Sequence, residues 1–161
     1  LVHQWRAQEQ AILVGTTTAI EDNPKLNVRS WGGGNPTRVV IDRTLKISED
    51  SHVYDQSMKT IFLTEVKREN EINLLFEKID FSKSLAQEIS DVLYKHHIQS
   101  VIIEGGTQTL QTFIDSGLWD EARVFTGNVN FENGVVAPVF NFESNHRKEL
   151  GSDFLKVYYN D

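Results

Sequence analysis

The sequence predicts an α/β fold with a mixed sheet that is mainly parallel and has an antiparallel C-terminal edge. Short apolar runs suited to buried strands alternate with helical segments, which is typical of parallel sheets with helices on both faces. A long stretch without helical periodicity precedes the last apolar run, FLKVYY (154–159). We therefore expect the last two strands to lie antiparallel at one edge of the sheet.

Composition narrows the possible classes of function. The 161 residues fit one domain, and 39% are hydrophobic, which is enough for a packed core. The net charge of −7 argues against a nucleic-acid or anionic-membrane partner. Without cysteine, and without histidines at metal-ligand spacing, no metal site is predicted. No signal peptide or apolar run of the ~20 residues that span a bilayer is visible, so we expect a cytoplasmic protein.

The first third of the chain reads as helix, strand and helical turn. Residues 1–10 are helical in character, and the run AILVG (11–15) predicts a strand buried on both faces. Residues 16–29 predict a short helical turn capped by threonine, which Pro24 stops before an extended piece. The glycines of WGGGNP (31–36) precede a strand and not a helix, so they predict a connecting loop.

The remaining elements follow from apolar runs and periodicity. Strands are predicted at 37–42, 59–64, 101–103 and 120–127, and residues 74–81 are expected to be extended. Residues 84–98 predict an amphipathic helix. A second helix should follow the glycine pair after residue 104 and end at Ser116-Gly117.

The most informative segment is VIIEGGTQTLQTFIDSGL (101–118). In open α/β sheets, ligands bind at the carboxyl ends of strands, where a glycine turn and a helix N-terminus hold phosphate groups. Gly105 and Gly106 let the backbone approach a pyrophosphate, and Thr107 or Thr109 can cap the helix or bond a phosphate oxygen. The alternative is a strand–turn–helix connection in which the glycines only form the turn.

Three kinds of charged residue are candidates for a site. Glu104 ends an apolar strand, so its carboxylate requires a ligand, a cation or backbone donors as a partner. Arg6 and Arg29 can bind an anionic group in bidentate fashion, or can be ordinary solvated arginines. Asp22 precedes Asn-Pro, where an aspartate also commonly closes a turn on its own backbone.

Three segments together resemble a known family. HQWRAQEQAILVGTTTAIEDNPKLNVR, NPTRVVIDR and VIIEGGTQTLQTFIDSGLWDEARVF are similar, in order and spacing, to the pyrimidine reductase domain of riboflavin biosynthesis. The resemblance covers most of residues 1–127. It implies a dihydrofolate-reductase-like fold and NADPH-dependent reduction of 5-amino-6-(5-phosphoribosylamino)uracil, in which the ribosyl chain becomes ribityl.

The resemblance also implies site residues. Arg6, Leu26, Arg29 and Glu104 correspond to substrate contacts, the two arginines being suited to the 5-phosphate. Thr18 and Asp22 correspond to NADPH contacts, and Asp22 and Glu104 are the titratable candidates for proton transfer. The cofactor-phosphate segment corresponds to Gly106, Thr107, Gln108, Thr109, Leu110, Gln111 and Thr112.

The sequence departs from the family pattern in two places. The N-terminal strand with its Ser-Leu-Asp-Gly-like motif and the following substrate segment are not present, so residues 1–161 are expected to be a reductase domain that lacks them. The position after TRVVID holds Arg43, which can pair with a 2′-phosphate, where many members have a small hydroxyl residue.

The resemblance implies partners as well. Many members carry a preceding deaminase domain, and the family's habit predicts a homodimer. Two alternatives stay open. One is a related pyrimidine or pterin reductase, and the other is a non-catalytic nucleotide-binding or dimerisation domain.

Overall fold

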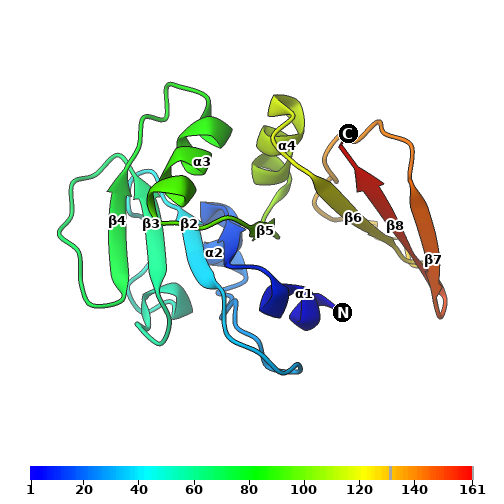
Figure 1. The fold of residues 1–161 in the computed structure, drawn as a ribbon, viewed down its shortest axis with the longest axis horizontal. Coiled ribbons are helices and arrows are strands. Elements are labelled where there is room, and N and C mark those ends of the chain that lie inside the picture. Colours follow the sequence, from blue (N-terminus) through cyan, green and yellow to red (C-terminus); the bar gives the residue numbers. More distant parts are fainter. Residues whose placement is uncertain (131, 161) are drawn as a thin grey trace.

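The fold is known from a computed structural model that describes residues 1–130 and 132–160. A five-stranded parallel sheet occupies one side of the molecule, in the order β4-β3-β2-β1-β5 (Figure 1). Its strands are β1 (Ala11–Val14), β2 (Thr37–Ile41), β3 (Thr60–Thr64), β4 (Leu74–Lys78) and β5 (Val101–Ile103). Each was expected from an apolar run, and the α/β class is confirmed.

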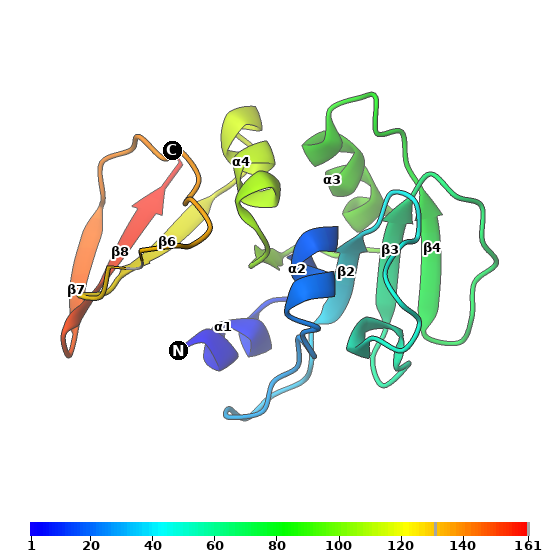
Figure 2. The same ribbon diagram turned by 180° about the vertical axis from the view of Figure 1, so that it is seen from behind.

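Helices cover both faces of this sheet. One face carries α3 (Leu85–Lys95) and α4 (Thr107–Ser116), and the other carries α2 (Thr16–Glu21) and the 3-10 turn η1 (His52–Tyr54) (Figures 1 and 2). Neighbouring side chains of a strand point to opposite faces of the sheet, so each strand contributes to two separate cores. Leu13, Val39 and Ile61 pack in the core under α3 and α4. Their neighbours Ile12, Val40 and Phe62 pack in the second core.

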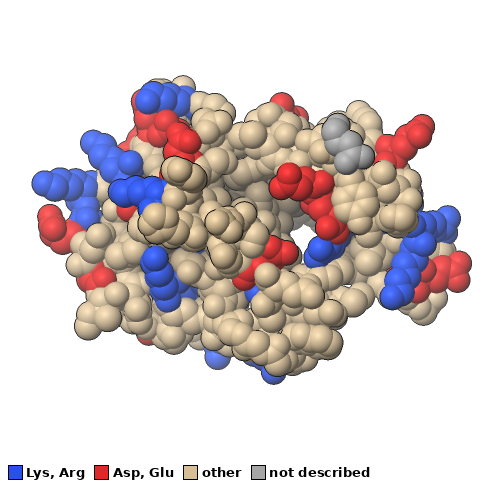
Figure 3. All heavy atoms as spheres, viewed as in Figure 1, with Lys and Arg blue, Asp and Glu red and all other residues tan. Residues whose placement is uncertain are grey.

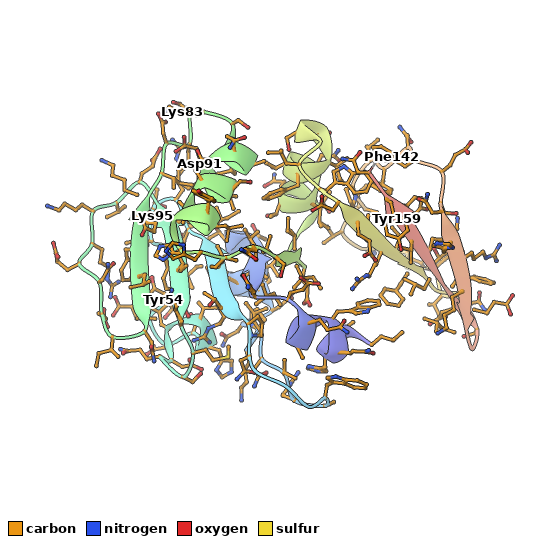
Figure 4. All side chains as sticks on the ribbon, in the orientation of Figure 1. Tyr54, Lys83, Asp91, Lys95, Phe142 and Tyr159 are labelled. Carbon is orange, nitrogen blue, oxygen red and sulfur yellow. The ribbon has the colours of Figure 1, made fainter. Side chains whose placement is uncertain are left out.

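The C-terminal strands form a separate antiparallel sheet. It contains β6 (Glu121–Thr126), β7 (His146–Leu150) and β8 (Asp153–Tyr159), in the order β6-β8-β7. We expected two strands at one edge of a single mixed sheet, so this detail differs. The polar sequence HRKEL carries no apolar run, which is why β7 was missed. Its local core is aromatic, where Phe140 lies 5.3 Å from Trp119 and 4.9 Å from Tyr158 between ring centroids. The neighbouring Phe142 and Tyr159 are labelled on the same side of the molecule in Figure 4.

The helix α1 (Val2–Gln8) connects the two parts of the molecule. The Trp5 ring lies 5.7 Å from the Phe125 ring of β6, and the Arg123 guanidinium lies 4.3 Å from the Trp5 ring centroid. The apolar residues Leu1 and Val2 are exposed. Within the described residues, none of the helices has the length and hydropathy to cross a membrane.

The edges of the two sheets remain unjoined. Among the described strands, β5 pairs with β1 alone and β6 pairs with β8 alone. The side chains of β5 are half-buried. An opening bordered by acidic and basic side chains lies between the two parts of the molecule (Figure 3).

Arg38 of β2 forms buried contacts at the amino ends of the strands of the parallel sheet. The residue is fully buried, and its guanidinium donates to the Thr60 hydroxyl at 2.8 Å and to the His52 carbonyl at 2.6 Å. It also pairs with Asp55 at 2.8 Å. Burial opposes ionisation of Asp55, but hydrogen bonds from Arg38 and Ser57 outweigh it and lower its pKa to about 2. These contacts lie at the amino ends of the strands and stabilise the fold.

Candidate functional site

Two glycine turns meet at the carboxyl ends of β1 and β5. A Cβ atom on Gly105 would lie 2.7 Å from the Cα of Val14, so only glycine permits this approach of the two backbones. Likewise, a Cβ on Gly15 would lie 2.5 Å from the Thr109 hydroxyl oxygen. The absence of side chains at Gly15 and Gly105 therefore allows the starts of α2 and α4 to lie close together.

The N-terminus of α4 faces outward at this junction. Gly106 is its N-cap and has a φ of 64°, a conformation that favours glycine. The first amides of a helix have no acceptor within the helix, and its positive end favours anions. A Cβ on Gly106 would lie 3.2 Å from the Thr18 hydroxyl oxygen, so the structure brings these two predicted cofactor residues together.

The threonine caps that we predicted are wrong. Gly15 and Gly106 are the N-caps of α2 and α4, and neither helix has a side-chain cap within the described residues. The threonine hydroxyls have other acceptors, because Thr16 donates to the Ile41 carbonyl at 2.5 Å and Thr107 donates to the Val136 carbonyl. A glycine N-cap leaves the helix amides open to a ligand.

Within the predicted phosphate segment, some residues are exposed and others already form hydrogen bonds within the protein. Gly106 and Gln108 are exposed, whereas Thr109 is buried and Leu110 is partly buried. Thr112 donates to the Gln108 carbonyl at 2.9 Å. Gln111 exchanges hydrogen bonds with the backbone of Val139. The most exposed residues of the segment therefore lie at its start.

Glu104 has the cationic partner that its position required. Arg6 donates from Nε to Oε1 at 2.8 Å and from Nη2 to Oε2 at 2.5 Å, in a bidentate arrangement. Both side chains are largely buried, at 14% and 22% exposed. Two predicted substrate residues that are 98 positions apart are thus joined beside the glycine turn. The Arg6 charge is shared with a carboxylate and is not reserved for an incoming anion.

The segment that follows α2 places the other predicted substrate and cofactor residues. Asp22 and Arg29 are exposed, and the backbone amide of Arg29 contacts His3 Nδ1 at 3.4 Å. Arg6 also donates to the Asn27 carbonyl at 3.3 Å, so this segment lies against α1. Leu26, with a φ of 55°, is 3% exposed and belongs to the second core. The substrate contact expected of Leu26 stays a prediction.

A second polar group lies at the carboxyl ends of β2 and β3. Arg43 Nη2 lies 2.8 Å from Glu65 Oε1, and hydrogen bonding to Glu65 together with its charge raises the pKa of Arg43. The guanidinium also lies 5.5 Å from the ring centroid of Phe81. We missed Glu65, although its position directly after the third apolar run matches that of Arg43 after the second.

An open hollow of about 540 Å³ lies next to this pair, beside the carboxyl end of β4. It is lined by Glu65, Lys78, Ile79, Asp80 and Glu88. Lys83, labelled in Figure 4, lies 3.7 Å from a Glu88 oxygen and 4.0 Å from an Asp80 oxygen. The hollow is open to solvent, and carboxylates predominate in its lining.

Comparison of the sequence with known proteins identifies one family. A family model described as the RibD C-terminal domain matches residues 1–129. A riboflavin biosynthesis protein RibD from Synechocystis sp. is 27% identical over 98% of this chain and 48% of its own length. A 2,5-diamino-6-ribosylamino-4(3H)-pyrimidinone 5′-phosphate reductase from Aquifex aeolicus is 30% identical over 76% of this chain and 58% of its own length. The chain therefore spans about half the length of these curated relatives.

Solved structures show the same fold. The deaminase/5-amino-6-(5-phosphoribosylamino)uracil reductase of Thermotoga maritima superposes with a TM-score of 0.84 and 28% identity, over 97% of this chain and 46% of that chain. The riboflavin biosynthesis reductase of Saccharomyces cerevisiae superposes with a TM-score of 0.79 at 20% identity. Because the family model matches 129 of the 161 residues, the chain belongs to the RibD C-terminal domain family.

Proposed function

We propose that this chain is a reductase domain that uses NADPH to reduce 5-amino-6-(5-phosphoribosylamino)uracil to its ribityl form. The observation that carries the proposal is the glycine turn Gly105-Gly106, which leads into α4 beside the Arg6–Glu104 pair. Membership of the RibD C-terminal domain family and relatives that are named reductases support it.

The residues present fit a dinucleotide cofactor. The open amides at the start of α4 suit a pyrophosphate, and a side chain at the exposed position 106 would lie at the same turn, next to the Thr18 hydroxyl. The hydroxyl of Thr18 lies next to Gly106, within reach of a group bound there. When bound, the reduced nicotinamide supplies a hydride to C1 of the ring-opened ribosylamine.

The residues of this chain position the substrate and its charges. Glu104 accepts two hydrogen bonds from Arg6, so it suits an orienting role better than proton donation. Asp22 is exposed and is the remaining candidate for the group that delivers a proton to the nitrogen. The exposed side chain of Arg29 is suited to the 5-phosphate, with Arg6 contributing a charge that Glu104 partly neutralises. Holding both reactants in register can supply about 7–11 kcal/mol of the barrier.

A second pyrimidine is a specific alternative substrate. The relative from Aquifex aeolicus is named for a 2,5-diamino-6-ribosylamino-4(3H)-pyrimidinone 5′-phosphate, which differs from the uracil compound in its base. The arginine at position 29 serves either phosphate equally. Rates with both substrates therefore decide which base this chain accepts.

NADPH oxidation with each substrate tests the proposal, in the protein that contains this chain. We expect turnover with at least one phosphorylated pyrimidine, and a roughly ten- to hundredfold rise in substrate KM for Arg29→Ala, because a charge-assisted hydrogen bond contributes about 1.5–3 kcal/mol. An unphosphorylated analogue is the control, and its KM should not change. No turnover with either pyrimidine, from a folded protein that binds NADPH, would favour the non-catalytic alternative.

We also propose that the domain contains one more strand, outside these 161 residues, between β5 and β6. The half-buried apolar edge of β5 and the exposed edge of β6 support it, since unpaired edges of this kind are normally covered. In a protein with that strand, the amides of β5 and β6 should exchange with solvent about as slowly as those of β1. Exchange as fast as in β7 would contradict this arrangement.

We propose two further partners, a deaminase domain in the same protein and a second copy of the chain. The deaminase/reductase name of the Thermotoga maritima protein supports the first. Val135, Val136 and Val139 are 87%, 80% and 66% exposed, which supports a homodimer contact. Sedimentation should show a dimer that Val135→Asp weakens, whereas Val66→Asp, at an exposed position elsewhere, should leave it intact.

A further inference from the structure

The ends of β2 and β3 hold two residues of opposite charge in fixed positions. The Glu65 amide donates to the Arg43 carbonyl at 2.9 Å, and the Thr64 hydroxyl donates to the same carbonyl at 2.9 Å. The backbones that carry the two side chains are thus tied together, and the ion pair closes above them at 2.8 Å. The exposed fractions of the two side chains, 60% and 39%, leave both accessible to a ligand.

These two residue types have different tasks in nucleotide-binding α/β folds. A carboxylate at a strand end accepts hydrogen bonds from the ribose 2′-hydroxyl of NADH, and an arginine accommodates the 2′-phosphate of NADPH. This chain has one of each at neighbouring strand ends. A 2′-phosphate placed against Arg43 would meet the Glu65 carboxylate 2.8 Å from the same guanidinium.

We infer that Glu65 is a specificity-determining residue that restrains the preference for NADPH over NADH. The inference rests on the proposed function and extends it to the adenosine end of the cofactor. Glu65 competes with the 2′-phosphate for Arg43 and repels it directly, since like charges a few ångströms apart interact unfavourably. The same carboxylate can accept a hydrogen bond from an unmodified ribose hydroxyl.

The surroundings of the pair contain both acidic and basic residues. Three of the five residues that line the neighbouring hollow are acidic, namely Glu65, Asp80 and Glu88, and Lys78 also lines it. Lys83 lies within 4.0 Å of Asp80 and Glu88, so these two carboxylates have a cation of their own. The carboxylate that pairs with Arg43 is Glu65, so a charge effect at position 43 should depend on Glu65.

Binding titrations of NADPH and NADH test the inference, with wild-type protein and the variants Glu65→Gln, Arg43→Ala and Glu69→Gln. Glu65→Gln keeps the side-chain length and removes the charge. We expect the NADPH-to-NADH affinity ratio to rise by about threefold to tenfold in Glu65→Gln and to fall in Arg43→Ala. Glu69→Gln, at an exposed glutamate four positions away, should leave the ratio unchanged.

The salt dependence of the affinity ratio tests whether Glu65 acts through its charge or through its shape. Raising the ionic strength towards ~1 M should shrink the effect of Glu65→Gln, because exposed charges are then screened over about 3 Å. An unchanged ratio in Glu65→Gln, from a wild-type protein that binds both cofactors, would overturn the inference and leave the proposed function standing. A folded wild-type protein that binds neither cofactor would overturn both the inference and the proposed function.

Discussion

The two sheets of this chain obtain their stability in different ways. In β1, β2 and β3 nearly every residue is buried, so each strand packs between helices or loops on both faces. In β6 and β7 most residues are exposed, and the antiparallel sheet depends on cross-strand pairs and on the aromatic group around Phe140. The difference indicates that the parallel sheet carries most of the hydrophobic free energy, whereas the antiparallel sheet tolerates substitution.

Two arginines, Arg38 of β2 and Arg123 of the edge strand β6, give the largest contrast. Arg38→Met should reduce the free energy of unfolding by about 3–5 kcal/mol, because its partners Asp55 and the His52 carbonyl lose a buried cation. Arg123→Met should cost about 1–2 kcal/mol, because the Arg123–Glu121 pair is partly exposed and the guanidinium also packs on the Trp5 ring. Urea unfolding of both variants measures the contrast. Equal costs would show that the two sheets do not differ as proposed.

A matched pair of valines gives the next effect. Val40 of β2 is 0% exposed, and Val124 of β6 is 37% exposed. Val40→Ala should destabilise the protein by about 2–3 kcal/mol, since it removes two buried carbon atoms and leaves a cavity. Val124→Ala should change the stability by about 0.5 kcal/mol or less. A large loss from Val124→Ala would mean that β6 is covered in solution.

Two glycines sharpen the comparison at the strand ends. Gly105→Ala should cost about 1–2 kcal/mol, because its Cβ would lie 2.7 Å from the Cα of Val14. Gly127→Ala, after β6, should be nearly neutral, since the nearest atom is 3.6 Å away. Thermal unfolding measures the stabilities, and an NADPH titration of Gly105→Ala shows whether the glycine turn also serves the cofactor. Unchanged stability of Gly105→Ala would show that the two backbones can move apart at no cost.

The smallest expected effect depends on pH. The pKa of Asp55 is lowered from 3.8 to about 2, so its ionised form stabilises the folded protein above pH ~4. That contribution should be lost as the pH falls from ~4 towards ~2. Because the side chain is 34% exposed, we expect about 1 kcal/mol. Unfolding of wild-type and Asp55→Asn from pH 6 to 2.5 should show a difference that shrinks as the pH falls, and a constant difference would contradict the ion-pair explanation.

The difference in burial between the two sheets also explains why the sequence predicted the parallel sheet better than the antiparallel one. Apolar runs such as TIFLT in β3 are a strong signal, because a strand buried on both faces has few alternatives. The strand β7 reads HRKEL and has no such signal, because its side chains face solvent. The separation of the two sheets depends on pairing between distant strands, which periodicity within a segment does not report.

The candidate site was predictable only where local chemistry was involved. The glycine turn and the need of Glu104 for a partner follow from residues near position 105. The identity of that partner, Arg6, depends on the pairing of β1 with β5, which brings α1 to the end of β5. Glu65 was missed because only its position beside Arg43 makes it informative, and that position depends on the pairing of β2 with β3.

The hydroxyl of Thr107 links the start of α4 to the long connection before β7. It donates its single proton to the Val136 carbonyl, so that proton is not at the same time available to a phosphate oxygen. A ligand that recruits Thr107 must therefore release residue 136, and a contact that holds residue 136 must weaken such a ligand by the same factor, because coupling between two sites is reciprocal. In the proposed homodimer, whose contact includes the exposed Val135 and Val136, self-association and the affinity for the proposed cofactor would be thermodynamically linked through this hydrogen bond.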